Sequence, residues 1–127
     1  MRKKTMRQIR FKAKRLDNGE WVEGLPIIYK VDGSYMWREC REPVRIDPNT
    51  LCQFTGLKDC EGKEVWEHDI TLDAGDEMEV IFYDGSFMLH DVKDRNNDED
   101  IPLCRCGEKG MIINRVVGNK FDKGEKK

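Results

Sequence analysis

The chain has 127 residues, of which 38% are charged and 38% are hydrophobic, and its formal net charge at pH 7 is −2. This length suits one domain or two very small ones, and eleven aromatic residues (three Trp, three Tyr and five Phe) argue against a disordered chain. No apolar run approaches the roughly 20 residues that span a bilayer, and no signal-peptide pattern follows the basic start, so we expect a folded cytoplasmic protein without membrane contact.

The charges are distributed unevenly. Residues 1–45 contain twelve Lys/Arg and six Asp/Glu, which gives +6, whereas residues 46–127 contain eleven and nineteen, which gives −8. A strand over residues 7–16 would have one apolar and one basic face, because side chains alternate across a strand. The apolar face would hold Ile9, Phe11 and Ala13, and the cationic face Arg10, Lys12 and Lys14.

The cationic face has two interpretations. Several Lys/Arg on one surface can follow a phosphate backbone, since releasing counterions favours nucleic-acid binding. The same face suits an edge strand that resists unwanted pairing, or a surface that meets the acidic half of a neighbouring subunit. The slightly acidic overall charge favours the second interpretation.

Short strands separated by turn residues follow along the chain. Turn signals such as Asp17-Asn18-Gly19 recur every eight to twelve residues without a helical period, which predicts an all-β protein. The expected strands cover residues 20–25, 27–31, 35–40, 64–66, 69–72, 77–83, 87–92 and 111–117. Residues 43–48, bounded by two prolines, are expected to form a connector, and only residues 103–109 suit a turn of helix.

The cysteines favour reduced thiols over a disulfide framework, because their number is odd and no signal peptide is present. They are Cys40, Cys52, Cys60, Cys104 and Cys106. A zinc site usually shows two close pairs, whereas this chain has only the Cys-x-Cys pair, with His68 and His90 scattered elsewhere. We therefore expect neither a metal nor another cofactor.

The sequence Glu67-His68-Asp69 places an imidazole between two carboxylates, which is a pattern that suits acid-base catalysis. Adjacent strand residues point to opposite faces, however, and would not converge on one substrate. No nucleophile motif or phosphate-binding glycine loop accompanies the pattern. We therefore expect a solvated turn histidine, no catalytic residues and no enzyme activity.

The segment from residue 51 to 70 resembles the signature of the YopX family. It contains Gln53-Phe54-Thr55-Gly56-Leu57, an Asp/Gly turn, and Gly62-Lys63-Glu64-Val65-Trp66-Glu67-His68-Asp69-Ile70, in which His68 stands where the family usually has glycine. Residues 6–13, 80–87 and 116–119 resemble further family segments. The signature residues are Gln53, Thr55, Gly56, Leu57, Gly62, Trp66, Glu67, Asp69, Ile70, Gly118 and Asn119.

The resemblance implies a fold and a setting, but no activity. Family members are small phage or prophage proteins with a small SH3-like barrel, so we expect such a barrel over residues 51–119 and an attached layer of short antiparallel strands over residues 1–50. Residues 120–127 depart from the family pattern as a charged tail. Within the barrel, Trp66 and Ile70 are expected to be core residues, and Asp69 to accept backbone hydrogen bonds in the turn.

Three function classes follow in order. The first is a non-enzymatic phage or prophage accessory protein that binds a protein partner or assembles as a homo-oligomer. The second is a nucleic-acid-associated protein that uses the cationic face, with Trp21, Tyr35 or Trp37 as stacking surfaces. An enzyme is the third.

Overall fold

This computed structural model describes residues 8–29, 33–73, 75–93, 100–103, 107–108 and 110–122, and within them the predicted all-β class is confirmed. The chain divides between Phe54 and Thr55 into two compact units. The strands in these ranges are β1 (Phe11–Arg15), β2 (Trp21–Tyr29), β3 (Gly33–Trp37), β4 (Val44–Lys58), β5 (Glu64–Trp66), β6 (Asp69–Asp73), β7 (Asp76–Tyr83), β8 (Ser86–Asp91), β9 (Ile101–Pro102), β10 (Gly107–Glu108), β11 (Met111–Ile112) and β12 (Arg115–Asn119).

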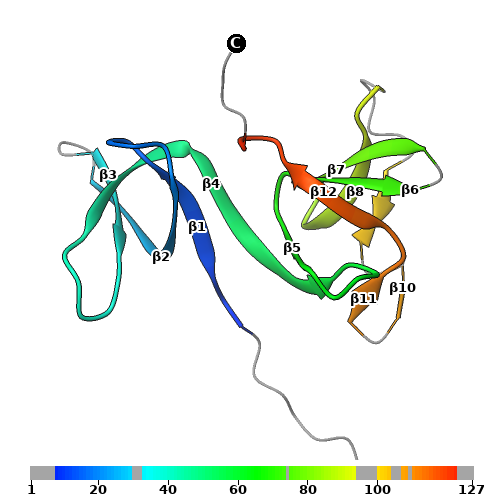
Figure 1. The fold of residues 1–127 in the computed structure, drawn as a ribbon, viewed down its shortest axis with the longest axis horizontal. Coiled ribbons are helices and arrows are strands. Elements are labelled where there is room, and N and C mark those ends of the chain that lie inside the picture. The colour runs from blue at the N-terminus through cyan, green and yellow to red at the C-terminus, as the bar shows by residue number, and fades with distance from the viewer. Residues whose placement is uncertain are drawn as a thin grey trace, which may run out of the picture. The chain divides into compact units, whose positions relative to one another are not determined.

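The strands of the first unit pair in a closed circuit. β1 pairs with β2, β2 with β3, β3 with β4, and β4 again with β1, all antiparallel. Figure 1 shows β1 between β2 and β4. The sequence predicts an attached layer here, and the pairing of β4 with β1 closes that layer on itself. The core of this unit consists of Ala13, Val22, Met36 and Ile46, with Leu51 packed against them.

The predicted connector over residues 43–48 is wrong, because this segment begins β4. Pro48 is tolerated inside the strand since the register with β1 shifts there, from Cys52 opposite Lys12 to Asp47 opposite Lys14. The Thr50 hydroxyl accepts the Lys14 N–H (2.8 Å) and donates to the Asp47 carbonyl (2.7 Å). The Thr50 side chain thus accepts the Lys14 N–H, which the irregular backbone of β4 leaves without a carbonyl partner.

Gly24 lies where β2 approaches the backbone of β3 very closely. A Cβ at this position would clash with the Trp37 carbonyl oxygen and would lie 2.7 Å from Met36 Cγ. We expect Gly24→Ala to lower the free energy of unfolding by at least about 1–3 kcal/mol, as overpacking against backbone does. Urea denaturation measures this effect.

A matched control for this substitution is Gly118→Ala. The nearest atom to a Cβ there is Asp122 Oδ2 at 3.6 Å, an ordinary contact, so this variant should unfold close to the parent protein. Equal urea midpoints for the two alanine variants would contradict the close approach at Gly24.

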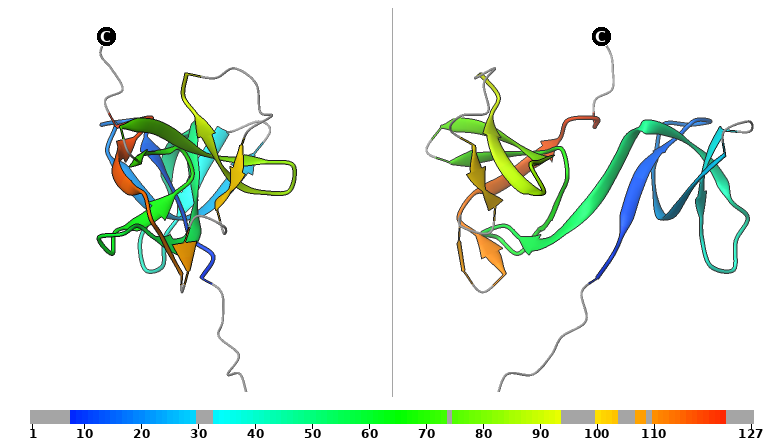
Figure 2. Two further views of the ribbon diagram at one scale, coloured as in Figure 1. Left: turned by 90° about the vertical axis from the view of Figure 1, so that its right-hand side faces the viewer. Right: turned by 180° about the vertical axis from the view of Figure 1, so that it is seen from behind.

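The second unit contains a five-stranded sheet in the order β12-β6-β7-β8-β9, and the end of β4 pairs with β5 and β11. In Figure 2, β6, β7 and β8 run side by side. The core of this unit consists of Val65, Val80, Leu89, Leu103, Ile112 and Val116.

Two expectations for the carboxyl-terminal region change. The single predicted strand over residues 111–117 is wrong, because β11 ends at Ile112 and β12 begins at Arg115. Between them Asn114, which is buried, donates from Nδ2 to the Thr71 hydroxyl (3.3 Å). Of the expected helical turn over residues 103–109, Leu103 adopts a 3-10 helical conformation and residues 107–108 form β10, while 104–106 and 109 lie outside the described residues.

Candidate functional site

The turn between β4 and β5 is built around the carboxylate of Asp59, which is completely buried. Its Oδ1 accepts the N–H groups of Glu61 (2.8 Å) and Lys63 (2.8 Å), and its Oδ2 accepts the N–H of Val116 in β12 (2.9 Å). Burial by itself would raise the pKa of Asp59, but these three hydrogen bonds and the nearby Lys63 ammonium outweigh it and lower that pKa below its ordinary value.

The sequence alone reveals only part of the structural role of Asp59. An aspartate that opens a turn ending in glycine is a recognisable signal for the bonds to Glu61 and Lys63. The bond to Val116, 57 residues further along the chain, has no such signal.

Asp69 organises the next turn, and its predicted role there is confirmed. The Trp66 N–H donates to Asp69 Oδ2 (2.7 Å). The Asn119 side-chain amide donates to Asp69 Oδ1 (2.9 Å) and to the Glu67 carbonyl (3.2 Å). Two signature residues that lie 50 positions apart in the chain therefore form one hydrogen-bond network.

The other signature residues also have mainly structural surroundings. Trp66 is buried as expected, whereas Ile70 is only half-buried and lies opposite Glu79, so its expected place in the core is wrong. The Thr55 hydroxyl donates to the Val65 carbonyl (2.7 Å). Gln53 lies opposite Phe11 in the pairing of β4 with β1, and Leu57 packs against the core of the second unit. Gly56 and Gly62 adopt positive φ angles of 88° and 85°.

His68 adopts a φ of +71°, the left-handed conformation that glycine adopts most easily. Its Nδ1 lies 2.8 Å from Glu79 Oε2, its Nε2 lies 3.7 Å from Glu67 Oε2, and its ring meets the edge of Phe121. The expectation that His68 lies in a turn is confirmed, but its side chain contacts Glu79 and Phe121, so the expectation that it is solvated is wrong. Glu67 and His68 do converge, because they occupy a turn and not a strand, while the Asp69 carboxylate is engaged by Trp66 and Asn119.

Glu79 connects this histidine with the neighbouring strand. It lies opposite His90 of β8, whose Nδ1 is 2.8 Å from Asp100 Oδ1. Burial tends to raise the pKa of Glu79, but the hydrogen bond with His68 and the charges of Lys120, His68 and His90 lower it overall. The hydrogen bond between His68 and Glu79 suits a brace that joins the turn to the sheet.

The three predicted cationic residues lie together, although their surroundings differ. Lys12 Nζ and Lys14 Nζ lie 4.5 and 4.7 Å from the centre of the Trp21 ring. Arg10 forms two hydrogen bonds to Glu23 Oε2 (2.7 and 3.0 Å), so a carboxylate already matches its charge. The predicted apolar face is confirmed at Ala13, but Ile9 is 54% exposed and lies outside the core.

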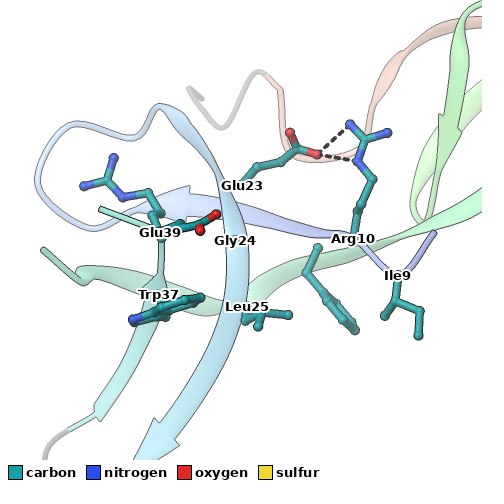
Figure 3. A pocket seen from close by; sticks show the side chains of 9 residues that line it. Ile9, Arg10, Glu23, Gly24, Leu25, Trp37 and Glu39 are labelled. Atoms are coloured by element: carbon teal, nitrogen blue, oxygen red, sulfur yellow. Dashed lines mark hydrogen bonds and ion pairs between the residues drawn. The ribbon is translucent and has the colours of Figure 1, made fainter. Parts of the chain in front are cut away.

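Ile9 instead lines a groove of about 320 Å³ in the first unit. Figure 3 shows Leu25 between Trp37 and Ile9, with the Arg10–Glu23 pair across the groove. Leu25 and Trp37 lie opposite each other in β2 and β3 and are 48% and 44% exposed. The apolar lining consists of Ile9, Phe11, Leu25 and Trp37, and the polar lining of Arg10, Glu23, Arg38 and Glu39.

Of the cysteines that the structure describes, Cys40 and Cys60 are exposed thiols, and Cys52 is buried, with its Sγ 3.4 Å from the Thr50 carbonyl oxygen. Cys104 and Cys106 lie outside the described residues. Within the described part of the chain, no three His, Cys, Asp or Glu side chains are grouped so that they could hold a metal ion. That the protein is metal-free stays a prediction.

Comparison with protein families matches residues 10–125 to the family described as YopX protein. The match covers nearly the whole chain and includes the signature turns of Asp59 and Asp69. No curated protein matches the chain. Among the residues placed by the structure, no helix is long and apolar enough to cross a membrane.

Proposed function

The chain belongs to the YopX family, and we propose that it is a non-enzymatic phage or prophage accessory protein whose first unit binds a protein, most simply a second copy of the chain. The groove of the first unit carries this proposal, because large apolar side chains at Leu25, Trp37 and Ile9 are each about half exposed within it. Exposed apolar surface of this kind commonly marks a protein-binding site.

Charge complementarity supports a second copy as the partner. Residues 1–54 contain twelve Lys/Arg and seven Asp/Glu, which gives +5, and residues 55–127 contain eleven and eighteen, which gives −7. A basic unit of one copy and an acidic unit of another would attract each other. We place this assembly in the host cytoplasm.

Two further proposals complete this view. We regard the second unit as a small SH3-like barrel, which is supported by its five-stranded sheet and its apolar core around Val80. The absence of an enzymatic role is supported by Asp69, whose carboxylate already accepts hydrogen bonds from Trp66 and Asn119, and by the hydrogen bond between His68 and Glu79.

Binding of single-stranded nucleic acid is the second candidate function. It is favoured by Trp21, a half-buried ring with two lysine ammonium groups within 5 Å, since bases stack on such aromatic rings beside cations. The Arg10–Glu23 ion pair and the net charge of −2 weigh against it.

Replacing Arg10, Lys12 and Lys14 together by glutamine separates the two functions. We expect the oligomer to loosen in light scattering, while binding of labelled DNA and RNA at low salt stays as weak as in the parent protein. If the strand contacts phosphates instead, the salt dependence of nucleic-acid affinity should flatten by about three units.

The control is a variant in which three exposed basic residues of the second unit, Lys58, Lys93 and Arg115, are replaced by glutamine, so that the net charge changes equally. This control should leave the oligomer intact. Micromolar binding of nucleic acid that disappears only in the first triple variant, with an unchanged oligomer, would reverse the order of the two functions.

A further inference from the structure

Arg38, which follows β3 directly, has a guanidinium group without a complete set of partners. Its Nη2 donates to the Glu42 carbonyl (3.1 Å). Its Nε is buried and has no hydrogen-bond partner among the described residues. A buried N–H group without an acceptor is destabilising, and more so when it is charged, so such a group calls for an acceptor.

Arg38 lies between two hollows of the first unit. It lines the groove with Trp37 and Leu25, and it also lines a more polar hollow of about 520 Å³ with Arg15 and Glu42. An acceptor bound at Arg38 would therefore be within reach of a molecule that lies in the groove.

The other arginines of these two hollows that form ion pairs show which acceptor fits. Arg10 presents Nε and Nη2 to Glu23, and Arg15 presents the same two nitrogens to Asp17 (3.0 and 2.9 Å). In the part of the chain that is described, Arg38 lies in no ion pair with a carboxylate. Its Nη2 carries a second hydrogen beyond the one given to Glu42, so Nε and Nη2 can together bind one carboxylate when the side chain rotates and uncovers the buried Nε.

We propose that Arg38 binds a carboxylate of an acidic protein segment, and that an apolar side chain next to this carboxylate packs against Trp37 and Leu25. This inference rests on the proposed protein-binding function and names the chemistry of the partner. One unmatched guanidinium beside apolar side chains suits an Asp or Glu flanked by an apolar residue. It suits a nucleic acid poorly, since a phosphate backbone needs a row of cations and no apolar wall.

The acidic neighbours limit the site to one anionic group. Glu39 in the groove, and Asp17 and Glu42 in the polar hollow, would repel a second negative charge close to the first. The acidic second unit of another copy could supply such a segment, in keeping with its charge of −7 (eleven Lys/Arg against eighteen Asp/Glu).

Selection from a displayed library of random peptides on the full-length protein tests the proposal. We expect the enriched peptides to share an Asp or Glu next to an aromatic or aliphatic residue. Their affinity should fall at least about tenfold for Arg38→Gln and for Trp37→Ala. Arg41→Gln is the matched control, because it removes the same charge from an exposed residue outside both hollows and should bind as the parent does.

Two further readouts locate the contact. The NMR signal of the Arg38 Nε–H should shift when a selected peptide is added, and should not shift with the same peptide in its Gln or Asn form. If Arg38→Gln also loosens the oligomer, the segment belongs to a second copy, which supports the proposal.

Enriched peptides without acidic residues, or peptides that bind the Arg38→Gln variant equally well, would overturn the assignment of Arg38 and leave the protein-binding function standing. A library that yields no peptide, together with a monomeric protein in light scattering, would overturn both.

Discussion

Replacing Asp59 by alanine is expected to lower the free energy of unfolding by about 3–5 kcal/mol, because three backbone N–H groups lose their acceptor at once. These groups belong to Glu61, Lys63 and Val116, and the carboxylate that they share is completely buried. Chemical denaturation followed by circular dichroism measures the loss. Asp59→Asn should also destabilise the protein, since an amide offers an acceptor on one side only.

A matched control is Asp91→Ala, which removes a partly buried carboxylate that accepts the N–H of Lys93 (2.9 Å). This variant should lose about 1 kcal/mol or less. If the alanine variants at Asp59 and Asp91 unfold at the same denaturant concentration, the carboxylate of Asp59 does not join the turn to β12.

Asp59 should also shape the stability of the protein in acid. Its pKa is lowered on folding, so the stability that it contributes is complete above the pKa of the unfolded chain, which is about 3.9. This contribution is lost as the pH falls below that value and through the lower pKa of the folded state. When the pH is lowered from 5, the free energy of unfolding should therefore fall less for Asp59→Asn than for the parent protein. The difference should correspond to the contribution of one carboxylate.

Trp66→Ala is the second large change that we expect, with a loss of about 3–5 kcal/mol in the free energy of unfolding. The Trp66 side chain is only 6% exposed, and its strand, β5, carries the core residue Val65. Removing the ring leaves a cavity that a small unit cannot close without moving its backbone. The denaturant midpoint of the purified variant measures this loss.

The same substitution at Trp37 provides the control, because that ring is 44% exposed at the groove. We expect Trp37→Ala to change the stability by less than about 1 kcal/mol. A folded Trp66→Ala variant with an unchanged Tm would show that Trp66 is a surface residue and a contact candidate.

Much of the local structure follows from the sequence alone. The alternation of side chains along β1 correctly predicts that Ala13 is buried in the core and that Lys12 and Lys14 lie outside it. The expected strands over residues 77–83 and 87–92 agree closely with β7 and β8, and Asp84 and Gly85 between them adopt the positive φ that tight hairpin turns need. These features depend on side-chain alternation and on backbone preferences within a few residues, which the order of amino acids specifies directly.

The relations between distant segments were decided by the tertiary structure. β1 closes its circuit through β4, so residues between two prolines join a strand, and Thr50 supplies the missing acceptor at the irregular step. His68 meets Glu79 only because β6 and β7 bring them together. Pairing of this kind depends on register and on burial of the whole sheet, which outweigh local preferences.

The candidate sites, too, follow partly from the sequence and partly from the tertiary structure alone. The basic residues around Trp21 could be found from the sequence, since alternation along one strand groups them. Neither the junction of Asp59 with Val116 nor the groove at Trp37 could be found in this way. The first needs the register that sets β12 beside the turn, and the second needs β2 and β3 to leave Leu25 and Trp37 exposed on one side. Exposure and long-range hydrogen bonding are properties of packed chains, so only the folded structure determines them.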